Sequence, residues 1–492
     1  MNHRKILAAA VSAALVPAAF AADITGPSSS ESPYLKGLVP GVVIKSILTV
    51  GDSVNTKPDG VTPYRMVGIP DGLGAFDNGD GTFTVVMNHE LTDSLGIERV
   101  HGAKGAFVSK WIIGKGSLDV VSGEDLIQRI GVWNGSDWDY KSGADGVAIS
   151  RLCSADLPPV SAFYDDASGM GYNGYIFMNG EERGAEGLAY GHLLNGDSYQ
   201  LPWLGRFSWE NSVAHPDPGM KTVVVGLDDS GNGQVYVYIG TKTTSGDPID
   251  AAGLTNGRLY GVKVEGYASE PDAAGIPSGT RFSLVDLGDV SGLTGAELEQ
   301  DSNDGGVTGF QRPEDGAWNP QDLRQFIFAT TAGFNNNSRL FRLNFEDPTD
   351  PTRGGTIDTL INGDETDPDV RMMDNLTVND RGQVLIQEDP GGNVRLSKVI
   401  RYDISRDTFE YVAEHDPDRF LPGAPNFLTT NEESSGIIPA PFLGEGWYLA
   451  DVQAHYSVGD AELVEGGQLL AIHVPPGKPV GQAGKRQGPK AR

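Results

Sequence analysis

Short runs of β-branched and aromatic residues, each followed by polar or acidic residues, recur along most of the chain. Runs of this kind between turn residues are typical of β-strands, and long stretches with the apolar spacing of an amphipathic helix are hard to find. Six similar units recur at intervals of about 60 to 90 residues. They predict strands at residues 83–87, 175–178, 235–239, 326–329, 384–387 and 447–450.

The repeated units favour one radial fold. Their spacing exceeds the roughly 40 to 50 residues of an ordinary propeller blade, and long insertions between strands account for the excess. A radial array of blades brings equivalent strand ends together around a central channel. We therefore expect an all-β protein, a six-bladed β-propeller with long inter-strand insertions. The alternative is two or three β-sandwich domains, but no linker rich in Pro, Ser or Gly divides the middle of the sequence.

The two ends of the chain differ from the rest. A basic head, the apolar run 6–20 and the small-x-small sequence at 19–21 predict a signal peptide over residues 1–21. We expect one propeller domain over residues 22–474 and a disordered basic tail over residues 475–492. No run is long enough for an ordinary membrane span. Arg4-Lys5 stands where a twin-arginine signal has two arginines, so we expect the general secretion route and a periplasmic or secreted protein.

Charge narrows the range of partners. The net charge is −29, from 66 acidic and 37 basic residues. Such a surface repels nucleic acid and anionic lipid, and it makes divalent cations the natural counter-charge, although acidic surfaces also serve solubility alone. The one cysteine, Cys153, cannot form an internal disulfide. We expect a monomer whose stability comes from burial and from bound ions.

Most familiar catalytic and metal motifs are absent. There is no G-x-S-x-G elbow and no phosphate loop, and His89-Glu90-Leu91-Thr92-Asp93 lacks the second histidine of a zinc motif. The segment 228–233 begins like a helix-loop-helix calcium loop, but Ile239 stands where the bidentate glutamate belongs.

Carboxylates at strand ends are the remaining candidate chemistry. Any one of them is more often a turn residue or a solvated charge, but if all of them converge on one channel mouth, their repulsion requires cations. Oxygen-rich clusters favour calcium or magnesium, and many carboxylates suit calcium. Cys153 is either a small buried hydrophobe or a soft ligand for a metal such as iron. The carboxylates next to apolar strands are Glu90, Glu181, Glu182, Glu210, Asp228, Glu314, Asp374, Glu388 and Glu433.

At these same segments the chain resembles the PhoX-type alkaline phosphatases, a bacterial family of exported six-bladed propellers. The resemblance covers most of the mature chain, in pieces whose order and spacing are more specific than any piece alone. The matching pieces are Asn88-His89-Glu90, Glu181-Glu182, Glu210, Arg312-Pro313-Glu314, Asp374-Asn375-Leu376, Glu388-Asp389, Glu433-Ser434-Ser435-Gly436 and Asp451-Val452-Gln453-Ala454-His455.

The resemblance implies hydrolysis of a small phosphate ester by calcium ions and iron (Fe³⁺), bridged by carboxylates and one cysteine thiolate. On that basis Cys153 and Glu314 are iron ligands, the other acidic residues hold calcium, and Arg312 clamps the phosphate. Two features differ from the family: Cys153 lies further from Glu181 than the family's cysteine does from its glutamates, and the twin-arginine signal is missing.

Two other functions fit the same residues. A calcium-dependent lactonase on a similar propeller could use Asp374 and Asn375, because carboxylate and amide oxygens both suit calcium. A non-enzymatic surface or matrix protein could use calcium only to replace the stabilisation that disulfides would give.

Overall fold

The computed structural model describes residues 22–363 and 370–476. The expected signal peptide, and residues 477–492 of the expected tail, lie outside the described residues. The all-β expectation is confirmed: strands dominate, and the helices are the short α1 (Pro248–Ala251), α2 (Gly295–Gly305) and α3 (Pro417–Phe420). None of the helices in the described part of the chain is long and apolar enough to cross a membrane.

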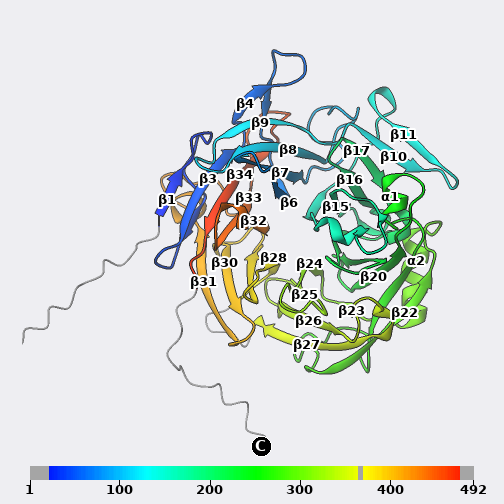
Figure 1. Ribbon diagram of the computed structural model, residues 1–492. Coiled ribbons are helices and arrows are strands. Elements are labelled where there is room, and N and C mark those ends of the chain that lie inside the picture. Colours follow the sequence, from blue (N-terminus) through cyan, green and yellow to red (C-terminus); the bar gives the residue numbers. More distant parts are fainter. Residues whose placement is uncertain (1–21, 364–369, 477–492) are drawn as a thin grey trace, which may run out of the picture.

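The strands form sheets that follow one another around a centre (Figure 1). The first is β6 (Pro70–Asp77), β7 (Thr82–His89), β8 (Phe107–Gly114) and β9 (Val120–Asp125). The second runs β12 (Leu152–Asp156), β15 (Ile176–Glu181), β16 (Ala189–Leu193), β17 (Asp197–Gln200), β10 (Arg129–Trp133) and β11 (Trp138–Lys141).

The third sheet is the largest, with ten strands. One half runs β18 (Trp209–Ala214), β19 (Lys221–Asp228), β20 (Gly233–Thr241), β21 (Arg258–Val264) and β22 (Thr280–Gly288). The other half runs β24 (Pro313–Trp318), β25 (Gln325–Thr330), β26 (Arg339–Phe345) and β27 (Gly355–Asn362), with β23 (Gly309–Phe310) paired to β20. The two halves of the described sheet join where β22 pairs with β27, over residues 280–282 and 355–357, and the short β23 adds a second link through β20.

The last two large sheets bring in strands from the N-terminal part of the chain. One runs β28 (Met373–Val378), β29 (Gln383–Glu388), β30 (Lys398–Asp403), β31 (Thr408–His415) and β2 (Leu35–Gly37). The other runs β32 (Glu432–Pro439), β33 (Trp447–Ser457), β34 (Glu465–His473), β3 (Val43–Thr49) and β1 (Ala22–Thr25). Because β3 pairs with β34, both chain ends are held in one sheet. Two-stranded ribbons, β4 (Ser53–Thr56) with β5 (Pro63–Arg65) and β13 (Tyr164–Asp165) with β14 (Met170–Gly171), lie apart from these sheets.

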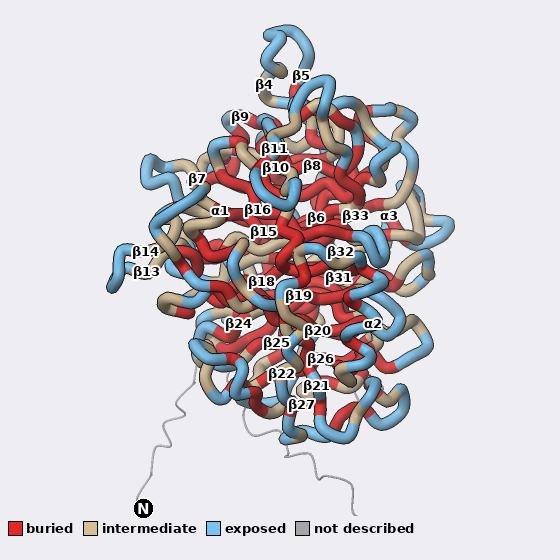
Figure 2. The backbone as a smooth tube through the Cα atoms, turned by 90° about the vertical axis from the view of Figure 1, so that its right-hand side faces the viewer, coloured by how far each residue is buried: buried red, intermediate tan, exposed pale blue. Residues whose placement is uncertain are grey.

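The innermost strands β6, β12, β18, β24, β28 and β32 form a ring, since each contacts the next and β32 contacts β6. Most strands next to this ring are apolar on both faces, as in β19, where seven of eight residues are buried. Two buried faces are expected when sheets stack on one another, because no face is left for solvent. Figure 2 shows the buried residues through the middle of the molecule and the exposed loops around it.

Neighbouring sheets approach closely enough to require glycine. Trp209 of β18 is fully buried and lies against Gly180 of β15 and Gly226 of β19. A β-carbon on Gly180 would lie 2.4 Å from the β-carbon of Trp209, and one on Gly226 would lie 2.8 Å from its ring. This close packing holds the ends of the innermost strands in place.

Candidate metal centre

The innermost strands share an irregularity at their first residues. In five of them the pairing with the second strand of the sheet shifts register directly after the first residue. A β-bulge of this kind turns the next side chain in a new direction. In β32 the shift comes later, between Ser435 and Ile437. The second residues of these six strands are Asp71, Cys153, Glu210, Glu314, Asp374 and Glu433.

The second strand of each sheet supplies an equivalent position beside the bulge. There a backbone N–H donates a hydrogen bond to a carbonyl oxygen just before the innermost strand. The N···O distance is 2.8 to 3.1 Å for all six innermost strands. The residues in these positions are Glu90, Glu182, Asp229, Thr331, Asp389 and His455. The repeated geometry therefore gathers two sets of polar side chains at one end of the ring.

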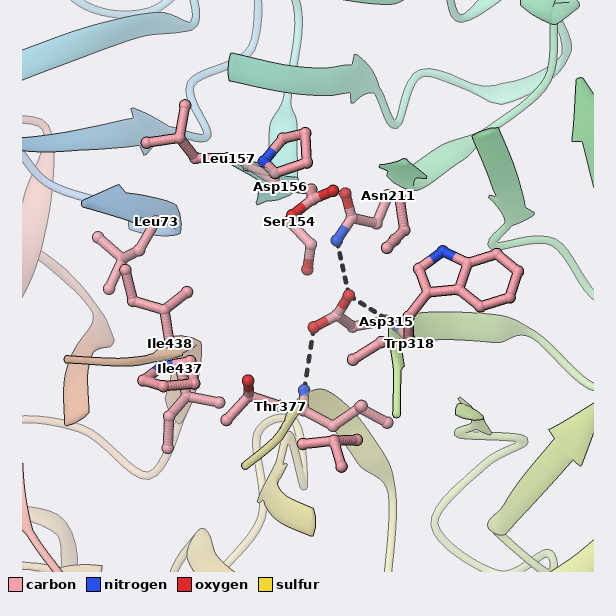
Figure 3. Close-up of a pocket in the computed structure, with 18 of the residues that line it drawn as sticks. Leu73, Ser154, Asp156, Leu157, Asn211, Asp315, Trp318, Thr377, Ile437 and Ile438 are labelled. Carbon is pink, nitrogen blue, oxygen red and sulfur yellow. Dashed lines mark hydrogen bonds between the residues drawn. The ribbon is translucent and has the colours of Figure 1, made fainter. Parts of the chain in front are cut away.

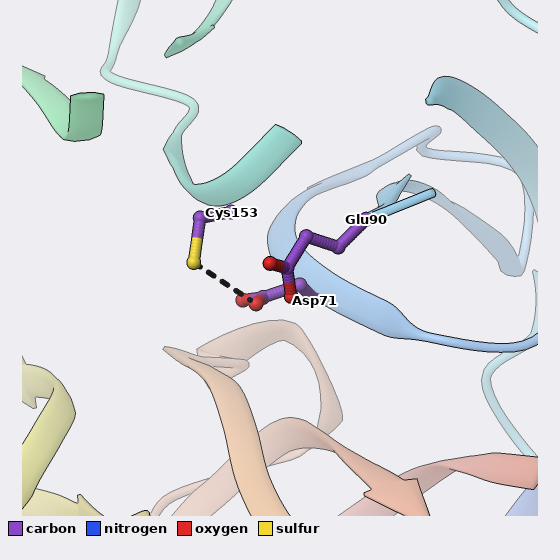
Figure 4. A group of neighbouring side chains, drawn as sticks. All are labelled: Asp71, Glu90 and Cys153. Atoms are coloured by element: carbon purple, nitrogen blue, oxygen red, sulfur yellow. Dashed lines mark hydrogen bonds between the residues drawn. The ribbon is translucent and has the colours of Figure 1, made fainter. Parts of the chain in front are cut away.

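Seven of these side chains form three overlapping groups. Within each group the possible ligand atoms lie within 4.8 Å of one another: Asp71 with Glu90 and Cys153, Cys153 with Glu182 and Glu210, and Glu210 with Glu314 and Asp374. All are buried except Glu182, which is half-buried. Figure 4 shows the first group, in which the Cys153 Sγ lies 3.5 Å from Asp71 Oδ2.

Burial and mutual repulsion raise the pKa of these groups. The pKa of Asp71 is well above its usual range because of burial and the neighbouring Glu90, and that of Glu314 is raised by burial and Asp229. Burial raises the pKa of Glu210 to about 8 and holds the Cys153 thiol protonated. Bound cations would reverse these shifts, because an opposite charge favours the ionised form of each ligand.

Two arginines stand at the edge of the carboxylate groups in equivalent places. Arg151 and Arg312 immediately precede β12 and β24, and both have left-handed backbone, with φ of 52° and 61°. Arg312 binds both carboxylate oxygens of Asp229 at 2.7 Å and lies 3.1 Å from Glu314. The Arg151 side chain is 42% exposed and that of Arg312 is 35% exposed, so both guanidinium groups reach solvent. Both are positive charges that an anionic ligand at these groups could contact.

The structure brings together six of the predicted site residues in these groups: Glu90, Cys153, Glu182, Glu210, Glu314 and Asp374. Two more lie beside them. The Glu433 carboxylate repels those of Asp71 and Asp374, and Asn375 donates to the Ser154 hydroxyl, which in turn donates to Glu210. Cys153 and Glu314, the expected iron ligands, fall in different groups joined by Glu210.

Three predicted ligands lie outside the groups found among the described residues. Glu181 accepts the Ser150 N–H at 2.9 Å, and Glu388 is held by Arg395 at 2.7 Å. Asp228 lines a separate cavity of about 190 Å³. Each precedes a residue of the second set, and adjacent side chains on a strand point to opposite faces. Their role as metal ligands stays a prediction.

Sequence reasoning did not include Asp71, Asp229, Asp389 or Arg151 among the site residues. A signal for Asp71 was present, because Pro70-Asp71-Gly72 opens its strand much as Pro313-Glu314-Asp315-Gly316 opens another. Arg151 has no comparable signal. It contacts Glu90 at 2.6 Å and Glu182 at 2.5 Å, and both contacts depend on the closed ring.

The donor set fits bound cations. It offers six carboxylates and one thiol in three overlapping groups, and the side chains that bind them include Arg151, Arg312, Ser154 and Gln453. Carboxylate oxygens are the ligands that calcium prefers, and a thiolate adds preference for a softer metal.

The neighbouring residues Glu181 and Glu182 point to opposite faces of their strand, so substituting each in turn tests which of them binds metal. We expect Glu182→Gln to lower bound metal and metal-dependent activity by about 10- to 100-fold or more, because it removes a charged donor. Glu181→Gln, its matched control, should keep the metal and lose at most a few kcal/mol of stability. Metal content and melting temperature of both variants would be measured. Equal metal loss in the two variants would contradict the grouping.

Comparisons with known proteins point to one family. A family model described as alkaline phosphatase PhoX matches residues 194–413. Among solved structures, Pseudomonas fluorescens PhoX in complex with vanadate, a transition state analogue, matches with a TM-score of 0.65 at 12% identity, covering 93% of this chain and 98% of that chain. At this identity the structural match shows the fold. The resemblance to the PhoX-type alkaline phosphatases is confirmed.

Other comparisons add no argument. Two variants of the Synechocystis apocarotenoid oxygenase match with TM-scores of 0.30 and 0.29 at 10% identity, covering 86% of this chain and 92% of theirs. No curated protein sequence matches the chain.

Proposed function

Starting from the match to the PhoX alkaline phosphatase family, we propose that this chain is a metal-dependent phosphoric ester hydrolase. The observation that carries the proposal is the convergence of seven ligand side chains at one end of the ring, beside two solvent-reaching arginines. The substrate class is a small phosphate monoester, which would bind where the arginines meet the carboxylate groups.

The metals we propose are calcium, with iron at the cysteine. Asp71, Glu90, Cys153, Glu182, Glu210, Glu314 and Asp374 would hold them. When bound, such cations stabilise the charge of a phosphoryl group in transfer and lower the pKa of water. The chain's own contribution is to hold the donors in place. Ser154 donates to Glu210 at 2.6 Å, and the Gln453 amide donates to Asp71 and Glu90 at 3.0 and 2.9 Å.

Arg312 is the residue we propose for orienting the phosphate. A guanidinium fork matches two phosphate oxygens and forms two parallel charge-assisted hydrogen bonds. Asp229 fixes that fork from one side, and the exposed part of the side chain stays available to a ligand. Arg151 has the equivalent place before β12, which is separated from β24 in the ring by β18. It could contact the same anion from the other side.

We extend the proposal to the whole architecture. The ten-stranded sheet counts as two blades that meet at β22 and β27, which makes six blades in one domain over residues 22–474. Pairing of β3 with β34 supports this, because it closes the last blade with a strand from the N-terminal part. We also propose export by residues 1–21, a periplasmic or secreted location and a monomeric state.

A turnover assay tests the function. The purified chain would be incubated with p-nitrophenyl phosphate after chelation, and again after calcium, iron or both are restored. We expect turnover that depends on the restored metals. Absence of turnover in every metal condition would overturn the proposal. Opening of a lactone in the same samples would favour the lactonase alternative, and a calcium-dependent rise in melting temperature without hydrolysis would favour a structural role for the ions.

Substitution of Arg312 tests its proposed role in orienting the phosphate. We expect Arg312→Ala to lower kcat/KM by about 10- to 100-fold, the loss of one or two charge-assisted hydrogen bonds. Arg312→Lys should recover little of this loss, because an ammonium group cannot bind two oxygens as a fork. Steady-state kinetics and metal content would be compared with Arg324→Ala, which removes an exposed arginine paired with Asp322. Full activity of Arg312→Ala would contradict the assignment.

A further inference from the structure

A second cavity lies on the axis of the ring, beyond the metal centre. Its volume is about 260 Å³, and all six innermost strands line it (Figure 3). The lining begins one residue after the ligand position on β6, β12, β18, β24 and β28. The cavity is therefore coaxial with the candidate metal centre and opens toward the opposite end of the ring.

A layer of hydrogen bonds separates the two sites. Ser154 donates to Glu210 on the metal side and accepts from the Asn375 amide. Asn211 donates to Asp315 Oδ1 at 2.6 Å, and the Leu376 N–H donates to Asp315 Oδ2 at 3.0 Å. Because these groups are bonded to one another, a ligand in the cavity would not touch the proposed metal ligands.

The cavity carries negative charge without a basic partner. Two carboxylates, Asp156 and Asp315, line it, and none of the described residues that line it is Lys, Arg or His. Burial raises the pKa of Asp156 to about 7, so this carboxyl group is at least partly ionised at pH 7 to 8. Both oxygens of Asp315 accept hydrogen bonds. Asp156 accepts the Ala214 N–H through Oδ2 at 2.9 Å, which leaves Oδ1 without a donor among the described residues.

Most of the remaining lining is apolar, and its other polar residues are Ser154, Asn211, Asn375 and Thr377. Leu73, Leu157, Trp318, Ile437 and Ile438 surround the two carboxylates (Figure 3). Calcium and magnesium require many oxygen ligands, and these walls offer few. A cation with methyl or methylene groups instead gains from burial against aliphatic side chains and from an aromatic side chain such as Trp318. Enclosed, mostly apolar cavities with a few polar groups are typical of small-molecule sites.

We propose that this cavity binds a small organic ammonium ion, with Asp156 as its counter-ion and the aliphatic and Trp318 side chains around its carbon groups. The site would be separate from the phosphate site and would select cations, whereas the phosphate site selects anions. The acidic surface of the chain, with net charge −29, would favour the approach of such a ligand.

Calorimetric titration with tetramethylammonium chloride tests the proposal on the full calcium-loaded chain. Sodium chloride at the same ionic strength and the uncharged tert-butanol serve as ligand controls. We expect saturable binding of one tetramethylammonium ion per chain and at least about tenfold weaker binding of tert-butanol. Phosphate-ester turnover is not the readout, so the result is independent of the proposed enzymatic function.

Variants locate the binding. Asp156→Asn should weaken binding at least about tenfold by removing the counter-ion. Ala317→Leu keeps every charge but fills part of the cavity, so it should weaken binding too, and it keeps the test valid if Asp156→Asn does not fold. Asp301→Asn, an exposed change on α2, should bind as the unchanged chain does. No saturable binding, or binding unaffected by both cavity variants, would overturn the proposal.

Discussion

Glu210→Gln is expected to lose phosphate-ester turnover by on the order of a thousandfold. Glu210 is the one carboxylate shared by two of the three ligand groups among the described residues, so its replacement weakens both groups at once. Glutamine keeps the size of the side chain and its bond from Ser154, but it removes the negative charge that a cation requires. Several kcal/mol of lost charge stabilisation corresponds to this loss of rate.

The matched control for that variant is Glu265→Gln, which changes an exposed glutamate just after β21. Its turnover should equal that of the unchanged chain. Initial rates with p-nitrophenyl phosphate would be measured at saturating calcium and iron, together with the melting temperature of each variant. A folded Glu210→Gln protein that keeps more than about a tenth of the turnover would show that Glu210 does not hold the metals.

Removal of metal is expected to destabilise the protein strongly, and more at high pH than at low pH. In the metal-free chain burial raises the pKa of Glu210 to about 8 and that of Asp389 to about 7. The folded state therefore keeps protons that the unfolded chain releases above about pH 4. Stability falls as pH rises wherever the folded state binds more protons. Each such group costs roughly 1.4 kcal/mol per pH unit between about pH 4 and its own pKa in the folded state.

Bound cations remove that cost, because they favour the ionised carboxylates. An ion at a free concentration of about 1,000 times its Kd stabilises the folded state by about 4 kcal/mol. We expect each calcium ion bound to this extent to raise the melting temperature of chelated protein by roughly 4 °C at pH 8 and by clearly less at pH 5. Scanning calorimetry with and without calcium at both pH values measures this. An equal calcium effect at both values would contradict the linkage between the ions and the buried carboxylates.

The sequence was sufficient to predict strands and an all-β protein. Residues such as Phe83 and Val85 have few alternatives to a buried strand, because β-branched and aromatic side chains pack well on a pleated surface. The acidic residues near the start of the innermost strands, such as Glu210 and Glu314, were also predicted, because an acidic residue next to an apolar run can be recognised in the sequence alone.

The register of the second strands could not be predicted in the same way. In two places the predicted carboxylate and the one in the second set differ by a single residue: Asp228 was predicted instead of Asp229, and Glu388 instead of Asp389. A shift of one residue moves a side chain to the other face of a strand, and only the pairing with the innermost strand fixes it. For Asp229 that pairing is the hydrogen bond from its N–H to the carbonyl of Ser208, a residue too far away in the sequence to fall within one short window.

The third unit was also placed on a different strand. The apolar run at residues 235–239 belongs to β20, whereas the strand equivalent to β7 and β15 is β19. Both strands are apolar because neighbouring sheets cover them on both faces, so hydrophobicity alone does not distinguish them.

Elemental analysis of the purified, dialysed chain tests the central claim, that distant acidic residues meet at one end of the ring and are neutralised there by cations. Mass spectrometry with an inductively coupled plasma would count the metals in the unchanged chain and in Glu210→Gln. We predict more than one tightly held cation per unchanged chain, with calcium present, and a clear loss in the variant. A folded chain that retains no calcium or iron after dialysis would contradict the account.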